Sequence, residues 1–194
     1  IREKGSIGIR ETVKQLIRVN PRSVVALRAM RKGASAQSKE DAIRSVGLSQ
    51  MGIAISDLSN ALTDPSPRVR REAAEAMGRI GTAAAARELN KLITENPELI
   101  EEETLVALGE TRSPEAVETL SKFLVDPSSI LRRAAAKALG RNGDEGAIPA
   151  QEKAVAQPGD PDLRRAGLQA LRILESRSVE VYSDALVYQH PSVR

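Results

Sequence analysis

The sequence predicts an all-α solenoid, in which a pair of antiparallel helices is repeated along the chain and stacked on its neighbours. Glycine recurs every 31 residues, at Gly47, Gly78, Gly109 and Gly140, and a fixed period of roughly 20–50 residues is typical of such stacked units. Apolar residues ahead of these glycines recur at helical spacing. The period-two alternation typical of strands is not sustained anywhere in the chain. We expect about five to six helix pairs with this period.

The helix that contains each periodic glycine is clearest in residues 64–81. Ser66 is a residue type that caps helix N-termini, and Pro67 suits the first helical position. Gly81 suits the left-handed conformation that closes many helices. Copies of this pattern lie in residues 126–143 and 160–172, a diverged one in 96–109 and a fainter one in 38–47.

A second series of helices is predicted between these copies. Each member shows apolar residues on one helical face, and helices of about three turns are of typical length. The marking residues are Val24, Leu27 and Met30; Ile55, Leu58 and Leu62; Leu89, Leu92 and Ile93; Val117, Leu120 and Leu124; and Val181, Ala185 and Leu186.

The periodic glycines themselves need a physical reason. A glycine inside a helix costs about 1 kcal/mol relative to alanine. Four such positions at one register indicate either a recurring contact too tight for a methyl group or a recurring helix end. The sequence alone leaves both explanations open.

Composition limits the chemistry that the chain can perform. Hydrophobic residues make up 41% of the chain and aromatic residues only 2%, so the core must be aliphatic. Cysteine is absent, which excludes disulfides and thiolate metal sites. His190, the single histidine, precedes Pro191 and is interpreted as a turn residue. We therefore predict no catalytic residue, no metal and no cofactor. No apolar run reaches the roughly 18 residues of a membrane span.

Both ends of the chain suggest a fragment of a longer protein. The chain starts with Ile1 rather than methionine and stops at Arg194, within what resembles the opening of another repeat. We expect one array over residues 1–194, truncated inside a repeat at its C-terminus. A basic leading half-repeat and helix would occupy residues 1–33, and regular repeats residues 38–189.

The unit DPSPRVRREAAEAMGRIG, residues 64–81, resembles the short HEAT-like repeat of the phycobilisome-lyase type. The resemblance covers nearly the whole chain and is strongest between residues 57 and 174. It implies a right-handed α-solenoid whose second helices line the concave face. The family mixes scaffolds, adaptors and a few enzymes, so the motif specifies the fold much better than the function. The expected function is that of a non-catalytic protein-binding or scaffolding domain.

The resemblance also suggests which residues meet a protein partner. They are the residues that begin the second helices and would therefore line the concave face. They are Arg68, Arg71, Glu98, Glu102, Ile130, Arg133 and Arg165.

Charge is distributed unevenly along the chain. Residues 1–33 hold nine basic and two acidic residues, whereas residues 88–118 hold two basic and nine acidic ones. The basic end is interpreted as a solvated face, a nucleic-acid contact or a contact with an anionic membrane surface. Aromatic stacking partners are missing from that region, which makes nucleic acid the least favoured.

A weaker likeness concerns the cellular context. Residues 10–22, followed by repeats, are similar to the cytosolic C-terminal extension of bacterial major-facilitator-type transporters. This likeness implies a cytoplasmic location, with a tether to the inner face of a membrane in the full-length protein.

Charged residues also recur at one register of the repeat. Arg70 and Arg71, Glu101 and Glu102, and Arg132 and Arg133 occupy equivalent positions, so the sign of the charge alternates along the stack. We interpret them as an inter-repeat ion-pair ladder rather than as an acid–base pair. The predicted ladder comprises Asp64, Arg70, Glu101, Asp126 and Arg132.

The main alternative function comes from the family resemblance alone. A phycobilin lyase would hold a tetrapyrrole and deliver it to another protein, with arginines for the propionates. Arg68, Arg132 and Arg164 are the candidates for that role. The near absence of aromatic residues argues against such a pocket.

Overall fold

The computed structural model describes residues 35–48 and 54–174 of the chain. Within these ranges the regular structure is entirely helical, as the sequence predicts. The basic half-repeat predicted for residues 1–33 and the C-terminal residues after 174 lie outside the described part, so the predicted boundaries of the array stay predictions.

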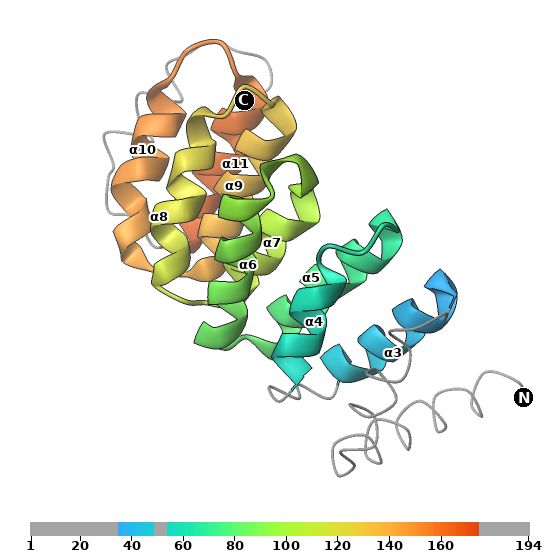
Figure 1. Ribbon diagram of the computed structural model, residues 1–194. Helices are drawn as coiled ribbons and strands as arrows, with labels where there is room; N and C mark the ends of the chain where they lie inside the picture. Colours follow the sequence, from blue (N-terminus) through green and yellow to red (C-terminus); the bar gives the residue numbers. More distant parts are fainter. Residues whose placement is uncertain (1–34, 49–53, 175–194) are drawn as a thin grey trace, which may run out of the picture.

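The helices form two rows that run side by side along the array (Figure 1). We call the helices that contain the periodic glycines, or their register, the glycine row. They are α3 (Ala36–Leu48), α5 (Pro67–Ile80), α7 (Glu102–Glu110), α9 (Ser129–Asn142) and α11 (Pro161–Ile173). The second row comprises α4 (Ile55–Ala61), α6 (Ala83–Glu95), α8 (Glu115–Lys122) and α10 (Ile148–Ala156). Each helix of the glycine row packs on the next one in that row, and each helix of the second row packs on the helix that follows it.

The ends of α5 follow the sequence signals. Pro67 is the first helical residue and Gly81 closes the helix in the left-handed conformation, with a φ of 65°. Ser66 occupies the N-cap, but its side chain makes no capping hydrogen bond. Instead, its backbone N–H donates to Oδ1 of Asp64 at 2.9 Å. The Asp-Pro-Ser turn therefore holds the helix start through the aspartate.

The periodic glycines lie where successive helices of the glycine row meet at their backbones. A Cβ atom built on each glycine would overlap an alanine of the next helix, because it would lie only 2.8–3.0 Å from that residue's Cα. Of the two explanations left open by the sequence, the tight contact is therefore correct. The pairs are Gly47 with Ala76, Gly78 with Ala107, Gly109 with Ala138, and Gly140 with Ala170.

A large apolar core lies between the two rows, with a smaller cluster of Val155 and Leu171 near its C-terminal end. Met77, Leu108 and Leu139, which precede three of the periodic glycines, are completely buried and belong to the same cluster. The second row contributes Leu58, Leu89 and Leu120, which are also completely buried. Complete burial of such a side chain contributes about 1.5–3 kcal/mol, so the aliphatic core needs no aromatic residues.

The diverged copy differs from its prediction. Residues 96–109 do not form one helix, because a 3-10 turn over Pro97–Leu99 precedes an extended Ile100 and α7 begins only at Glu102. Glu102 and Glu103 lie in the first turn of α7, where the helix dipole favours negative charge. The shorter helix therefore begins with carboxylates where α5 and α9 carry arginines.

Candidate protein-binding groove

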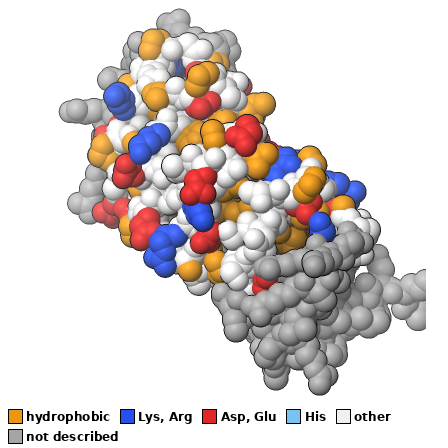
Figure 2. Space-filling model, viewed as in Figure 1, with side chains coloured by type: hydrophobic (Ala, Val, Ile, Leu, Met, Phe, Trp, Pro, Cys, Tyr) orange, Lys and Arg blue, Asp and Glu red, His pale blue; other side chains and the backbone are white. Residues whose placement is uncertain are grey.

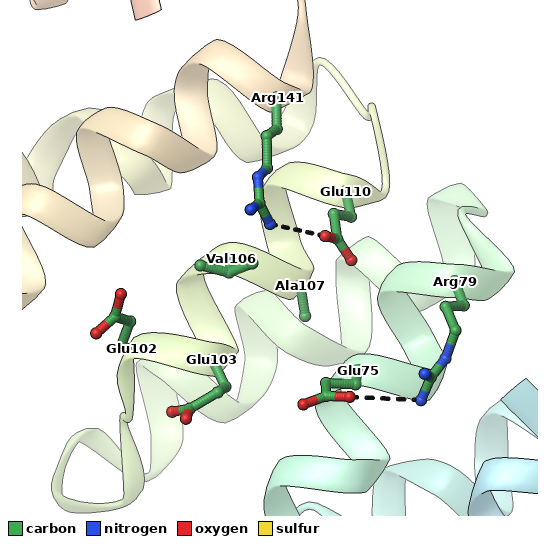
Figure 3. Close-up of a pocket in the computed structure, with 8 residues that line it drawn as sticks. All are labelled: Glu75, Arg79, Glu102, Glu103, Val106, Ala107, Glu110 and Arg141. Atoms are coloured by element: carbon green, nitrogen blue, oxygen red, sulfur yellow. Dashed lines mark hydrogen bonds and ion pairs between the residues drawn. The ribbon is translucent and has the colours of Figure 1, made fainter. Parts of the chain in front are cut away.

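An open groove of about 590 Å³ lies on the outer surface of the glycine row, across α5, α7 and α9. Its floor is partly apolar, through Val106 and Ala107, and its walls are charged (Figure 3). The residues that line it are Glu75, Arg79, Glu102, Glu103, Val106, Ala107, Glu110 and Arg141.

The repeat register explains why these residues meet. Three positions of the repeat lie on one face of the helix, because each is four residues from the next. They are the seventh and the third residue before the periodic glycine, and the residue after it. On α7 this stripe is acidic with one apolar residue, on α9 it is basic, and on α5 it is mixed. The three stripes are Arg71, Glu75 and Arg79 on α5; Glu102, Val106 and Glu110 on α7; and Arg133, Lys137 and Arg141 on α9.

One end of the groove is closed by ion pairs between its own residues. Arg141 pairs with Glu110 of the preceding helix at 2.8 Å, and Arg79 lies 3.6 Å from Glu75 on its own helix (Figure 3). The residues that follow the glycines, Arg79, Glu110 and Arg141, thus alternate in sign along the array. At this end the charges are largely compensated.

A buried carboxylate connects this end to α3. Glu72 is 8% exposed and accepts hydrogen bonds from Arg44 at 2.7 Å and from Arg79 at 2.8 Å. The hydrogen bond and the charge of Glu72 raise the pKa of Arg44 above its ordinary value. Two guanidinium groups therefore compensate the carboxylate and hold α3 against α5.

At the other end of the groove Glu103 pairs with Arg71, but one charge of the lining and one on the adjacent α9, outside the lining, are not compensated. Among the residues that the structure describes, neither Glu102 nor Arg133 forms a hydrogen bond or an ion pair through its side chain, although they occupy equivalent positions on adjacent helices. Nε of Arg133 is buried without a hydrogen-bond partner. Opposite charges are therefore available here for an external partner.

The structure brings some of the predicted ladder residues together and separates others. Arg70 and Glu101 pair at 2.8 Å. Arg71 lies 3.6 Å from Glu101 and pairs more closely with Glu103, at 2.9 Å, so Glu103 takes the place predicted for Glu102. Arg132 does not complete the predicted alternation with Glu101, because its side chain reaches the following repeat and donates to Asp160 at 2.8 Å through Nε.

Ion pairs at one register of the repeat join one unit to the next unit along the chain. Lys39, Arg70 and Arg132 each lie eight residues before their glycine, and each pairs with a carboxylate at the start of the next unit of the glycine row. Arg70 and Arg132 also donate to the two carbonyls of the turn before their own helix. Each arginine thus links its own turn to the next repeat.

Two of the turn aspartates, Asp64 and Asp160, are held in the charged form. Burial alone would raise the pKa of Asp64, but hydrogen bonds from Lys39 and from the N–H of Ser66 outweigh burial, and the pKa lies below its ordinary value. The pKa of Asp160 is lowered in the same way, because the N–H of Leu163 and Arg132 outweigh its burial. Asp126 accepts a hydrogen bond from the N–H of Ser128 at 2.8 Å, and within the part of the chain that the structure describes it pairs with no Lys or Arg side chain.

The residues predicted to line the concave face do not all meet in the groove. Glu102 lines it, and Arg71 and Arg133 occupy the same register on the neighbouring helices. Arg165 is their equivalent on α11 and lies 3.8 Å from Asp162. The others lie apart: Arg68 pairs with Glu40 at 3.2 Å, Ile130 is 52% exposed, and Glu98 is an exposed residue of the 3-10 turn.

Sequence reasoning missed most of the groove. Glu75, Arg79, Val106, Glu110 and Arg141 were not predicted to form a site. The signal that could have found them is their fixed distance from the periodic glycines, three residues before or one residue after.

Two of the three arginines considered for a tetrapyrrole are engaged within the fold, whereas the side chain of Arg68 is 71% exposed. Arg164 is only 4% exposed and donates to the carbonyls of Val155 and Gln157. Arg132 is bound to Asp160 and to turn carbonyls. These side chains therefore do not form an accessible set for propionates.

The face of the molecule drawn in Figure 2 carries no single dominant charge. Acidic, basic and apolar side chains are interspersed on it. In the described part of the chain, no helix is long and apolar enough to cross a membrane, and no group of three or more His, Cys, Asp or Glu side chains is placed to hold a metal ion.

The two rows of stacked helical hairpins define a repeat protein of the α-solenoid class. The family model for HEAT repeats matches residues 23–108 and again residues 98–172, which is more than half of the chain. The chain therefore belongs to the HEAT-repeat family.

Solved structures with a similar chain trace include human deoxyhypusine hydroxylase in complex with glycerol. The two share 19% identity over 95% of this chain and 84% of that one, with a TM-score of 0.44. An engineered protein from a structural genomics consortium is also 19% identical, over 90% of this chain and 92% of that one, with a TM-score of 0.58. At such identities the likeness concerns the fold alone. No curated protein matches the chain.

Proposed function

We propose that this chain is a non-catalytic repeat domain that binds a segment of a partner protein on the solvent-facing surface of its glycine row. The observation that carries this proposal is the groove across α5, α7 and α9, with the unpaired Glu102 in its lining and the unpaired Arg133 at the equivalent position of α9. Its volume of about 590 Å³ is in the range of sites that hold ligands. HEAT repeats in general mediate contacts between proteins, and this property agrees with the proposal.

The composition of the groove supports binding rather than catalysis. Its lining consists of glutamate, arginine, valine and alanine, with no hydroxyl, thiol or imidazole group. Carboxylates can also act as nucleophile or base, but three of the four glutamates in the lining, Glu75, Glu103 and Glu110, are paired with arginines.

We also propose that the glycine row forms the concave side of the array. Helices that meet at glycine and alanine can approach to the lower end of the usual interaxial distance, which is about 8–10 Å. Helices of the second row are separated by leucines such as Leu89 and Leu120. A stack with the narrower spacing on one side curves toward that side.

The proposed cellular context is cytoplasmic, with the chain as the C-terminal part of a membrane transporter. The basic character of residues 1–33 supports it, because lysine and arginine near the cytoplasmic side of a span contact anionic lipid. The reading frame upstream of Ile1 tests this part: membrane spans would support it, and their absence would contradict it.

Site-specific photo-crosslinking in cells tests the binding function. A crosslinking residue at position 106 replaces Val106 on the groove floor, and one at position 118 replaces Glu118 on α8, outside the groove. We expect a protein adduct from position 106 that is lost when Glu102→Arg is added, and no equivalent adduct from position 118. Equal adducts at both positions, or none at position 106, would contradict the proposal. Transfer of an added bilin to a phycobiliprotein subunit would favour the lyase instead.

A further inference from the structure

Two adjacent helices of the glycine row present stripes of opposite charge. The stripe on α7 carries Glu102 and Glu110 with Val106 between them, and the stripe on α9 carries Arg133, Lys137 and Arg141. The helices are immediate neighbours, since Gly109 of α7 packs on the backbone of Ala138 of α9. A molecule that crosses this face therefore meets negative charge and then positive charge over one helix spacing.

The two stripes differ along their length in how far they neutralise each other. Glu110 and Arg141 pair at 2.8 Å at the C-terminal end of the stripes. At the N-terminal end, Glu102 and Arg133 stand at the equivalent register but are not paired with each other. Within the described residues Lys137 also has no ion-pair partner. Complementary charges of a partner could therefore bind at the N-terminal end without displacing an existing ion pair.

The helix spacing sets the distance between the partner's charges. Packed helices lie about 8–10 Å apart. An extended chain in the polyproline II conformation advances about 3.1 Å per residue with three residues per turn, so residues three positions apart cover that distance and point to the same side. A helical partner would need about seven residues, at 1.5 Å each, and its body of about 10–12 Å would rest on both stripes together. An extended segment fits the alternation better.

We propose that this face binds an extended segment of a partner protein in which a basic residue over Glu102 lies three positions from an acidic residue over Arg133. The residues between them cross from α7 to α9, and Val106 lies one helical turn further along α7 from Glu102. This inference rests on the proposed binding function and specifies the chemistry of the partner. Charge complementarity of this kind sets the orientation of the segment and its preference over other segments.

Selection of displayed peptides tests the inference. Random 12-residue peptides are selected on the wild-type chain and on the charge-swap variant Glu102→Arg/Arg133→Glu, whose net charge is unchanged. On the wild type we expect enrichment of a basic and an acidic residue three positions apart in one chain order. On the swap variant we expect the same pair in the reverse order.

Affinity measurements on an enriched peptide give the second readout. The charge swap is expected to weaken binding at least about tenfold, because both contacts become repulsive. The matched control is Glu118→Lys/Lys122→Glu, which exchanges the charges of an exposed ion pair on α8. It should leave the affinity unchanged. Thermal unfolding of both variants shows that they remain folded.

The outcomes separate this inference from the proposed function. Peptides that lack the charged pair, carry it seven positions apart, or bind the swap variant equally well would overturn the inference and leave the binding function standing. Failure to select any peptide, together with an adduct at position 106, would also overturn it, because an extended segment would then not suffice. Failure of both experiments would remove the binding function as well.

Discussion

The two rows of helices stabilise the array by different means. In the glycine row, successive helices meet at backbone atoms, with Gly109 against Ala138 as an example. In the second row, large side chains such as Leu58, Leu89 and Leu120 fill the space. An atom added at a glycine contact would clash with the neighbouring backbone. An atom removed from a leucine of the second row would leave a cavity. The comparison shows that the register of the repeat is specified by the smallest residues of the chain.

The largest effect is expected for an added side chain in the glycine row. Gly109→Leu would place a Cβ atom against the carbonyl oxygen and Cα of Ala138, which belong to the backbone and cannot rotate away. We expect the free energy of unfolding to fall by about 3 kcal/mol or more, as measured by denaturant titration. The control is Gly143→Ala, at a left-handed position with open space around it, where about 1–2 kcal/mol is expected. Equal losses of stability for Gly109→Leu and Gly143→Ala would contradict the importance of the tight backbone contact at Gly109.

The next effect concerns the turn before α11, in which Asp160 connects α11 to Arg132 of α9. Asp160 caps α11 through the N–H of Leu163 and also binds Arg132. Asp160→Ala removes both contacts and should cost about 2 kcal/mol at neutral pH. Asp160→Asn keeps a capping oxygen and should cost about half as much.

The same aspartate predicts a dependence on pH. The folded-state pKa of Asp160 lies below its unfolded value of about 4, so its charge stabilises the fold above that pH. This contribution is lost as the pH falls through the lowered pKa. Unfolding measured between about pH 2 and pH 6 should therefore show a smaller loss of stability in acid for Asp160→Asn than for the wild type. Parallel curves would contradict it.

A stabilising change is expected in the second row. Gln151 occupies the register of Leu58, Leu89 and Leu120 and is completely buried. Its Nε2 donates to the carbonyl of Ala136 at 2.7 Å, but its buried Oε1 has no hydrogen-bond partner among the described residues. Gln151→Leu should raise the free energy of unfolding by about 1 kcal/mol, because it removes a buried acceptor without a donor. Destabilisation would show that the hydrogen bond to Ala136 matters more than the unpaired oxygen.

The smallest effects distinguish the charged residues at the start of α7. Glu101 pairs with Arg70 and Arg71, so Glu101→Gln should cost about 1 kcal/mol. Glu102→Gln should change stability by less than about 0.5 kcal/mol, since Glu102 has no ion pair within the described residues. Glu118→Gln, in an exposed pair on α8, serves as a second near-neutral control. A larger loss of stability for Glu102→Gln would indicate that Glu102 belongs to the predicted ion-pair ladder.

Much of the architecture could be predicted because it depends on local chemistry. Pro67 and Gly81 set the ends of α5 through their own backbone preferences, and the periodic glycines mark close contact. The helix α10 was not among the predicted members of the second row, because Gln151 interrupts the apolar pattern there. The break at Ile100 was also missed, since neither Pro97 nor the following glutamates specify where a helix resumes.

The candidate groove was less predictable than the fold. Glu102 was predicted at the start of a second helix and lines the groove, but the residues that line the groove with it come from three different helices. Which of several carboxylates meets an arginine depends on side-chain reach across the stack. Arg71 meets Glu103 and Arg132 meets Asp160 for that reason. Equivalent register positions predict proximity but not the pairing.

The contact between a glycine and the next alanine also has a consequence for how such a chain can change in length. Every junction in the glycine row uses the same two small residues, so removing one whole unit, residues 79–109, would leave Gly78 to dock on Ala138 with the same chemistry as before. The interior would close without a gap, because each unit touches only its neighbours. Duplication or loss of entire units is thus a route by which this protein could be lengthened or shortened while the remaining hairpins keep their packing.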